Sequence, residues 1–328
     1  MKNKKHIVSF DATPVKVRRS RRKLVLPDSV MDNLPKIIII SIIAVIVLIF
    51  LIIAGLMNVA RDIMKNQNSS SSTVSSGEVA YGERDSLTVL IVKTDDTKTI
   101  AEHFILMRLD PAENAAYFTP FSPDTVIASS GQTMGERYST AGAGGCAKDI
   151  EERFGSSKVY NSTINFASMI KLIDAVGGVK LTVEYDFNYK SKNNDRNIYC
   201  AKGSRSFSGG EAARLLDCPE WPGGVEEQRL MYARTFASIA NDILVQSRSN
   251  IIDKYYNKIS DAVTNNVGAG VFQDVLPALE NMAFYRDKSL RDITKIVPVE
   301  TTPAGDGKRA ITESSMQVMH RVYGRRDV

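Results

Sequence analysis

Four carboxylates lie in or beside the loops that follow predicted strands within residues 87–328. They are Asp95, Asp96, Glu102 and Asp124. Carboxylate oxygens are the ligands that hard cations prefer, so Asp95, Asp96 and Glu102 are candidate metal ligands, and Asp124 is a candidate for catalysis. The alternative is that all four are solvated loop acids, and this is favoured because loops are normally polar and exposed.

Several other chemistries are excluded by what the sequence lacks. After the N-terminal region it contains only His103 and His320, with no His-Glu-x-x-His motif and no cluster of metal-ligand spacing, which argues against a zinc site. The Gly-x-Ser-x-Gly motif of serine acyl enzymes is absent. Cys146, Cys200 and Cys218 form no Cys-x-x-Cys pair, and whether Cys200 and Cys218 pair with each other stays open.

Alternating strands and helices must position these residues. The hydrophobic pattern predicts strands at 87–94, 104–110, 115–121, 159–164, 180–187 and 293–300. It predicts helices at 144–155, 166–176, 208–217, 225–248, 251–263, 270–284 and 313–324. Strands interleaved with helices on this scale predict an α/β sandwich, with a mixed central sheet flanked by helices.

An apolar segment near the N-terminus predicts a membrane anchor. Ile37–Met57 is an uncharged run of 21 residues, and at about 1.5 Å per residue it is long enough to cross a hydrocarbon core of about 30 Å. A cleaved signal peptide is the alternative, but its apolar core is only about 7 to 15 residues long. The chain is therefore expected to comprise a basic tail (1–36), a transmembrane helix (37–57), a Ser-rich linker (58–86) and one outer domain (87–328).

The distribution of charge gives the orientation of this anchor. Residues 1–36 carry ten Lys/Arg and three Asp, a net charge of +7, whereas the whole chain is +5, so the remainder sums to −2. Positive residues stay on the cytoplasmic side, which predicts a single-pass protein of the cell membrane with a cytoplasmic N-terminus and an extracellular domain. The basic run 18–23 is interpreted as a topogenic and lipid-headgroup patch, and no nucleic-acid partner is expected.

One stretch of the outer region combines a helix, two glycines and a strand. In residues 158–183 a helical apolar pattern stops at Gly177 and Gly178 and continues as alternating Val179, Leu181 and Val183. With three further segments, 92–98, 118–125 and 207–216, it resembles the LytR-CpsA-Psr family of cell-envelope proteins, over most of residues 87–325. The order of tail, anchor and outer domain is similar too.

The resemblance implies a function. In that family the outer domain binds polyprenyl-pyrophosphate sugars, with Mg²⁺ present, and transfers the glycopolymer to peptidoglycan. Pyrophosphate sites need arginines, whose planar forks bind phosphate oxygens in pairs. The positions that match the family's arginines carry other residues here: Ile100, Pro123, Asp217, Pro219, Gly224 and Glu227. A carboxylate in place of a guanidinium adds a repulsion of ~4 kcal/mol per close unit-charge pair at an effective dielectric near ~20.

Three residues near these lost positions are further site candidates. Arg214 and Arg229 could replace the missing arginines and hold phosphate, although exposed helix arginines are the more common case. Trp221, the only tryptophan, lies between prolines and glycines where the family has the rim of its site. Its ring could stack on a sugar and so bind ligand, or it could fill the space left by the arginines, which is the interpretation we favour.

Two hypotheses follow for function. In the first, the chain is a divergent family member with a degenerate pyrophosphate site, and it binds or scaffolds lipid-linked glycopolymer or peptidoglycan during envelope assembly. In the second, Asp95, Asp96, Glu102 and Asp124 gather Mg²⁺ while Arg214 or Arg229 holds phosphate, and the chain is an active transferase. A membrane-tethered transcription regulator would rest only on the basic tail, which is too short for a DNA-binding fold.

Overall fold

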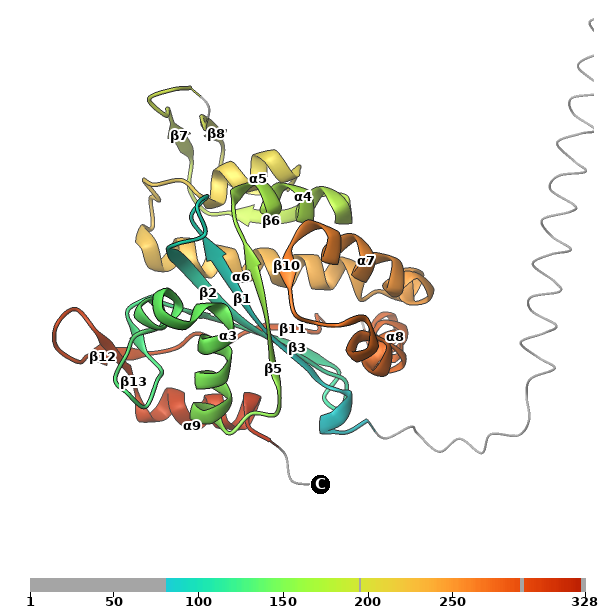
Figure 1. Ribbon diagram of the computed structural model, residues 1–328. Helices are drawn as coiled ribbons and strands as arrows, with labels where there is room; N and C mark the ends of the chain where they lie inside the picture. Colours follow the sequence, from blue (N-terminus) through green and yellow to red (C-terminus); the bar gives the residue numbers. More distant parts are fainter. Residues whose placement is uncertain (1–80, 195, 290–291, 326–328) are drawn as a thin grey trace, which may run out of the picture. The chain divides into compact units, whose positions relative to one another are not determined.

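The computed structural model describes residues 81–194, 196–289 and 292–325 (Figure 1). The predicted basic tail, the predicted transmembrane helix and nearly all of the predicted linker lie outside these residues. Within them, no helix has the length and apolarity needed to cross a bilayer. The description below concerns the unit Val79–Val328 by itself.

A mixed sheet forms the centre of this unit. Its strands are β10 (Thr264–Asn265), β5 (Val159–Ile164), β1 (Leu87–Thr94), β2 (Ala101–Asp110), β3 (Ala115–Phe121) and β11 (Thr294–Ile296), in that spatial order. The β1–β2, β2–β3 and β5–β10 pairs are antiparallel, whereas β1–β5 and β3–β11 are parallel. Every residue of β1 and β3 is buried, as expected of strands covered on both faces.

Helices cover both faces of the sheet, so the predicted α/β sandwich is confirmed (Figure 1). The helices on one face are α4 (Phe166–Val176), α5 (Gly209–Leu216), α6 (Gly224–Ile243), α7 (Ile252–Ala262) and α8 (Ala269–Ser289). The other face carries α3 (Met134–Phe154) and α9 (Glu313–Tyr323). Successive residues of β1 point to alternate faces, so Val89 belongs to the first core and Leu90 to the second.

Smaller sheets extend the domain at its ends. They are the pair β6 (Val179–Val183) with β9 (Gly203–Phe207), the hairpin of β7 (Phe187–Tyr189) with β8 (Ile198–Cys200), and the sheet of β4 (Thr125–Val126), β13 (Arg309–Ile311) and β12 (Thr301–Pro303). The short helices η1 (Glu83–Asp85) and η2 (Gln246–Ile251) complete the elements. Glu83 of η1 forms an ion pair of 2.7 Å with the buried Arg108, so ordered structure begins a few residues before the expected boundary at Leu87.

The helix, two-glycine and strand prediction for 158–183 is confirmed in detail. Asn165 caps α4 by accepting a hydrogen bond from the Ser168 backbone N–H. Gly177 ends the helix in the left-handed conformation, at φ 93°. Gly178 follows at φ 98°, and a Cβ there would lie 2.9 Å from the Phe207 carbonyl oxygen of the neighbouring strand β9. Both glycines are therefore required by the backbone.

Helix α3 and the β7–β8 hairpin differ from the sequence prediction, and the open question of a Cys200–Cys218 pair is answered. Helix α3 begins at Met134, ten residues before the expected start, and continues across a non-helical residue at Gly142, because Thr133 and Glu136 form a capping box that the glycine-rich stretch obscured. The β7–β8 hairpin was not predicted as a hairpin. Cys146, Cys200 and Cys218 are all buried free thiols, so Cys200 and Cys218 are not paired.

Candidate functional site

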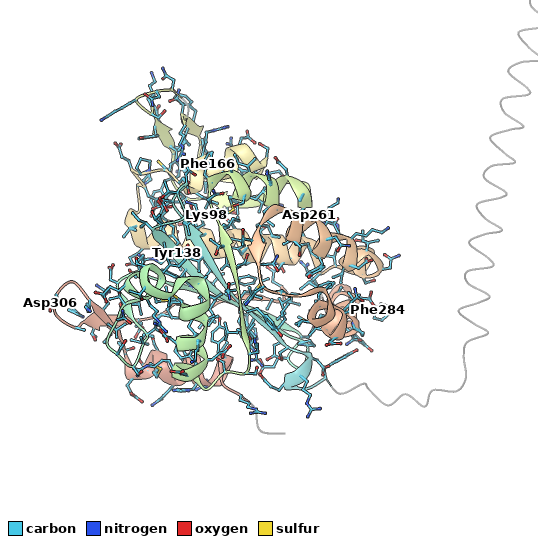
Figure 2. All side chains as sticks on the ribbon, in the orientation of Figure 1. Lys98, Tyr138, Phe166, Asp261, Phe284 and Asp306 are labelled. Atoms are coloured by element: carbon cyan, nitrogen blue, oxygen red, sulfur yellow. The ribbon has the colours of Figure 1, made fainter. Side chains whose placement is uncertain are left out.

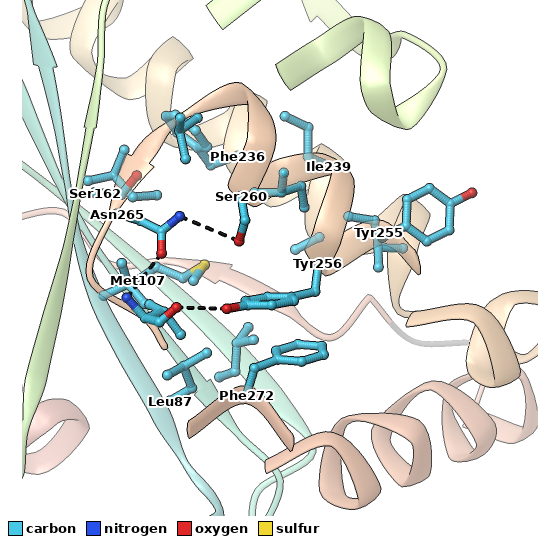
Figure 3. A pocket seen from close by; sticks show the side chains of 18 of the residues that line it. Leu87, Met107, Ser162, Phe236, Ile239, Tyr255, Tyr256, Ser260, Asn265 and Phe272 are labelled. Carbon is cyan, nitrogen blue, oxygen red and sulfur yellow. Dashed lines mark hydrogen bonds between the residues drawn. The ribbon is translucent and has the colours of Figure 1, made fainter. Parts of the chain in front are cut away.

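An apolar cavity of about 190 Å³ lies between the sheet and the helices α4, α6, α7 and α8 (Figure 3). Its floor is the face of β1 formed by Leu87, Val89 and Ile91, together with Met107 of β2. These positions alternate along the strand, so they share one face of the sheet. The sequence therefore supplies a continuous hydrocarbon floor at the middle of the domain.

The wall opposite the floor is built by helices. Phe236, Ile239 and Ile243 of α6 line the cavity, and they are spaced at the helical repeat. Tyr255 and Tyr256 of α7 also line it, as Figure 3 shows. The predicted long helix therefore supplies one wall of the cavity.

The few polar groups of the cavity lie to one side, near the edge strand β10. Asn265 Oδ1 accepts a hydrogen bond of 3.0 Å from the Val267 N–H. The hydroxyl of Tyr256 donates to the Val267 carbonyl at 2.7 Å. Both groups are satisfied by the Val267 backbone, and the rest of the lining is almost entirely hydrocarbon, which suits an aliphatic ligand.

A buried charged cluster adjoins the end of this cavity. Lys93 is two positions beyond Ile91 on the same face of β1, and Tyr232 is one helical turn before Phe236 on α6. Both side chains are buried, Lys93 at 2 % exposure. The Lys93 ammonium lies 2.6 Å from Glu102 Oε2 and 3.2 Å from Asp217 Oδ1. The Tyr232 hydroxyl donates a hydrogen bond to the same Asp217 oxygen.

A register shift in the sheet brings Glu102 to this cluster. Lys93 is paired with His103 and Thr94 with Ala101, so Glu102 has no register partner. Such a bulge changes the direction in which a side chain points. Without it, Glu102 would alternate with His103 onto the opposite face, away from Lys93. The periodicity of the sequence does not predict this contact.

His103 and Arg229 complete the cluster. The His103 ring stacks on Tyr232 with centroids 4.4 Å apart. Burial, then the nearby charges of Arg229 and Lys93, lower the pKa of His103 to about 3, so the ring is neutral. Arg229 is 6 % exposed and forms an ion pair with Glu226. Its Nε and His103 Nδ1 are buried without a hydrogen-bond partner among the described residues.

The loop acids proposed as metal ligands have separate partners. Asp95 accepts hydrogen bonds from the Thr97 side chain and from the Ile100 and Thr99 N–H groups, and these lower its pKa to about 2. Asp96 forms an ion pair of 2.8 Å with Arg196. These bonds hold the loop between β1 and β2, because Asp95 acts as its internal cap.

The candidates do not fit a resident Mg²⁺ ion. Glu102 forms an ion pair with Lys93. Asp95 accepts hydrogen bonds within its own loop, and Asp96 forms an ion pair with Arg196 of the β7–β8 hairpin. Asp124 is exposed, and its carboxylate accepts from the Ser122 hydroxyl at 3.2 Å. Over the part of the chain that the structure describes, no group of three or more His, Cys, Asp or Glu side chains is placed to hold a metal ion.

The remaining candidates from the sequence are Trp221 and Arg214. Trp221 is 7 % exposed and packs edge-to-face on Phe187, with centroids 4.8 Å apart. Arg214 is half-buried on α5, where its charge helps lower the pKa of Glu211 after the hydrogen bonds from Ser208. Ile100 is 62 % exposed at the position that matches a family arginine.

The arrangement at the end of β1 is therefore an ion cluster in which both cations, Lys93 and Arg229, are paired with carboxylates. Sequence reasoning named Glu102, Asp217 and Arg229 but missed Lys93, His103 and Tyr232. A lysine within an otherwise apolar strand was the available signal, because a buried lysine requires a nearby carboxylate.

Comparison with known proteins gives a family match. The model described as the LytR_cpsA_psr family matches residues 53–278, more than half of the chain. Among curated proteins, the polyisoprenyl-teichoic acid–peptidoglycan teichoic acid transferase TagV of Bacillus subtilis (strain 168) is 26% identical over 187 residues, or 53% of this chain and 46% of TagV. The match thus spans about half of that relative.

Solved structures share the fold at low sequence identity. A protein from Eubacterium siraeum is 18% identical with a TM-score of 0.66, covering 77% of this chain and 96% of that one. B. subtilis TagV is 17% identical with a TM-score of 0.58, covering 73% and 95%. TagT bound to LIIa-WTA is 15% identical with a TM-score of 0.54, covering 73% and 89%.

Proposed function

The chain belongs to the LytR_cpsA_psr family, and on that premise we propose that it serves cell-envelope assembly by binding a polyprenyl-linked glycopolymer through its lipid, without transferring the polymer. The observation that carries the proposal is the apolar cavity, which adjoins a cluster whose cations are already paired with carboxylates. Lipid binding and lack of transfer are separate parts of the proposal, and each has its own test.

The cavity supports the first part. A linear prenyl chain is pure hydrocarbon, and the floor of Leu87, Val89 and Ile91 offers only hydrocarbon contacts. Burial of apolar surface contributes about 25 cal/mol per Å², so a chain that lies along β1 gains affinity without needing polar contacts. The polar groups near β10 are satisfied by the Val267 backbone and do not compete.

The charged cluster supports the second part. A pyrophosphate at the end of the cavity would meet Lys93, but this ammonium already bonds Glu102 and Asp217. Binding would have to displace a carboxylate or place phosphate beside two of them, and like charges in a half-buried site repel strongly. Arg229 is similarly paired with Glu226. The site is therefore proposed to be degenerate.

The relatives support the setting. TagV carries the name of a teichoic acid transferase to peptidoglycan, and TagT has been solved with a ligand called LIIa-WTA. We therefore propose that this chain, as a member of the same family, also meets lipid-linked wall polymer and peptidoglycan. Membrane anchoring by 37–57, with residues 87–328 outside the cell, belongs to the same proposal.

A head-group series tests lipid binding. The full-length protein in detergent would be titrated with a prenol, its monophosphate and its diphosphate of equal chain length. We expect similar Kd values for all three, because the hydrocarbon supplies the affinity. Ile239→Trp, which fills the cavity, should weaken all three at least about tenfold. Val225→Trp on the exposed start of the same helix is the matched control and should bind normally. Diphosphate binding that is far tighter than prenol binding would contradict the degenerate site.

A transfer assay tests the second part. Full-length protein, lipid-linked teichoic acid precursor, peptidoglycan and Mg²⁺ would be incubated beside an active family member. We expect no transfer above background. Transfer at a comparable rate, abolished by Arg229→Gln, would instead establish the alternative of an active Mg²⁺-dependent phosphotransferase.

Orientation is tested in intact cells. A protease added outside should cleave a site inserted after residue 77 and leave a site inserted after residue 10 intact. The reverse pattern, or release of the protein from the membrane fraction by salt, would contradict the anchor and its orientation.

A further inference from the structure

Two aromatic side chains remain exposed near the end of α8. Phe284, which Figure 2 labels, is 41 % exposed, Tyr285 is 45 % exposed, and their ring centroids are 5.4 Å apart. Most large apolar side chains of the described domain are buried in the two cores that cover the sheet. A pair of exposed aromatic rings, one of which carries a hydroxyl, is typical of a surface that binds a partner with both an apolar and a hydrated region.

The described chain begins beside this aromatic pair. Helix η1 packs against α8. Burial raises the pKa of Tyr81, and the nearby Asp85 and Tyr285 raise it further, so Tyr81 lies close to Tyr285. Arg84 of η1 is exposed on the same segment. Tyr81, Arg84, Phe284 and Tyr285 are called the tether-side surface below, because the predicted linker joins the domain here.

We propose that the tether-side surface docks onto the headgroup layer of the membrane that holds the predicted anchor, an inference that rests on the anchoring part of the proposed function. Tyrosine prefers this layer because its ring is apolar and its hydroxyl is wet. Phenylalanine contributes apolar burial just below it. An exposed arginine can keep its guanidinium among lipid phosphates while its stem covers apolar surface.

The length of chain outside the structure makes this contact accessible. Residues 58–80 connect the predicted transmembrane helix to Tyr81. From its Ser-rich composition, a linker of that length is expected to have a root-mean-square span of about 27 Å, less than the diameter of an ordinary domain. The part of the domain nearest to the attachment point is therefore held at high local concentration over the bilayer, and weak interfacial contacts are sufficient for docking.

Docking of the tether-side surface would also bring the apolar cavity close to the bilayer. Leu279 of α8 lines the cavity, and it precedes Phe284 by five residues, or about 8 Å along the helix. The same helix therefore carries part of the cavity wall and the aromatic pair. A docked α8 brings the wall of the cavity to the bilayer, which is where a prenyl lipid resides.

Depth-dependent fluorescence quenching tests the proposal. Full-length protein carrying Phe284→Trp would be reconstituted in nanodiscs with ordinary or brominated phospholipids, and the signal of the parent chain, due to Trp221, subtracted. We expect a blue-shifted emission that brominated lipids quench at least about twofold, as for an interfacial tryptophan. Val225→Trp, 55 % exposed on α6, is the matched control and should be neither shifted nor quenched.

The outcomes separate this inference from the proposed function. An unshifted, unquenched Phe284→Trp signal in a protein that still binds prenol overturns docking alone. Equal quenching at both positions would also overturn it, because the contact would then be unspecific. Failure of the full-length chain to enter nanodiscs would overturn the anchor and docking together, while leaving the prenol titration in detergent to decide lipid binding.

Discussion

Lys93 is a buried lysine at the end of an apolar strand, and its two carboxylate partners decide what the site can do. The ammonium is fixed at 2.6 Å from Glu102 and 3.2 Å from Asp217. In the proposed degenerate site, these two carboxylates occupy the side of the ammonium that a phosphate would otherwise approach. A buried ion pair contributes little net stability, but removal of one partner leaves a costly unpaired charge.

The first prediction concerns this pairing. Lys93→Met, which keeps the size of the side chain, should lower the free energy of unfolding by about 3 kcal/mol because Asp217 loses its cation. Lys93→Met combined with Asp217→Asn should recover most of that loss, since Asn still accepts the Tyr232 hydrogen bond. Urea denaturation of the single and double variants measures the coupling. A single variant as stable as the parent would contradict the arrangement.

The second prediction concerns pH. The folded-state pKa of His103, about 3, lies below its ordinary value of 6.5, so the unfolded chain binds a proton that the folded chain does not. Stability from this residue is complete above pH 6.5 and declines as the pH falls toward 3, with a slope of up to roughly 1.4 kcal/mol per pH unit. His103→Phe keeps the stack on Tyr232 and should flatten the decline between pH 6 and about 4.5, measured by urea midpoints. An unchanged slope would mean that other groups dominate.

At the residue scale the sequence named three members of the cluster, but in other roles. Glu102 was named as a candidate metal ligand, Arg229 as a candidate to hold phosphate, and Asp217 as a position where a family arginine is missing. Lys93 and His103 were not combined with Glu102, because strand alternation places Glu102 on the opposite face and only the register shift brings it back. Asp95 and Asp96 were named as ligands, and the structure shows bonds to Thr97, Thr99, Ile100 and Arg196. Pattern alone does not distinguish a loop cap from a metal ligand.

At the scale of elements, a close approach of two helices explains the glycine at position 209. A Cβ on Gly209, at the start of α5, would lie 2.3 Å from the Ile170 carbonyl oxygen of α4 and 2.8 Å from Asp174 Oδ1. Asp174 also accepts a hydrogen bond of 2.7 Å from the Gly209 N–H. These segments therefore hold the framework together, and they carry the family resemblance for a structural reason.

The third prediction follows from that approach. Gly209→Ala should lower the free energy of unfolding by about 2 to 3 kcal/mol, because the methyl group forces α5 away from α4. Gly210→Ala is the control: its Cβ meets nothing closer than Arg214 Nη1 at 3.5 Å. That variant should be neutral or more stable by up to about 1 kcal/mol, since alanine favours helix. Thermal unfolding of both variants measures the difference, and equal effects would contradict the close contact.

Arg196, in the loop of the β7–β8 hairpin, joins this loop to two other parts of the domain. Arg196 forms an ion pair of 2.8 Å with Asp96, and its guanidinium lies 4.2 Å from the Phe166 ring centroid. The exposed pair is worth at most about 1 kcal/mol to global stability. Its effect on the hairpin is larger, because the strands are only three residues long.

The fourth prediction concerns this contact. Arg196→Ala should increase amide hydrogen exchange in residues 187–200 severalfold while changing global stability by less than about 1 kcal/mol. Lys192→Ala in the same loop is the control and should leave the exchange unchanged. Exchange that rises equally in both variants would show that Arg196 has no special role.

At this scale, long periodic elements were predictable and short ones were not. Strands β1 and β3 were predicted with their observed bounds, because their apolar runs end at clear turn residues. The strands of the β7–β8 hairpin and of the β4–β13–β12 sheet have only two or three residues each. Such strands leave no period to detect, and tertiary contacts decide them.

At the scale of the whole domain, the two faces of the sheet are built unequally. The face with α3 and α9 has a closed core around Phe121, Phe154 and Tyr323. The opposite face includes the cavity, and α7 on its wall has a single fully buried residue, Ile252. Elements with few buried contacts open at lower free energy than the rest of a domain. Helix α7 is thus the part of the cavity wall best suited to admit a lipid.

The fifth prediction tests this asymmetry by hydrogen exchange of the full-length protein. Without ligand, amides of α7 should exchange at least about tenfold faster than those of β1, because the helix opens locally. Prenol at about 100 times its Kd stabilises the bound form by about 2.7 kcal/mol and should slow exchange in α7 and α8. Helices α3 and α9, on the far side of the sheet, serve as the internal control and should keep their rates. Equal slowing on both faces would indicate global stabilisation and remove the assignment of α7 as the entrance of the cavity.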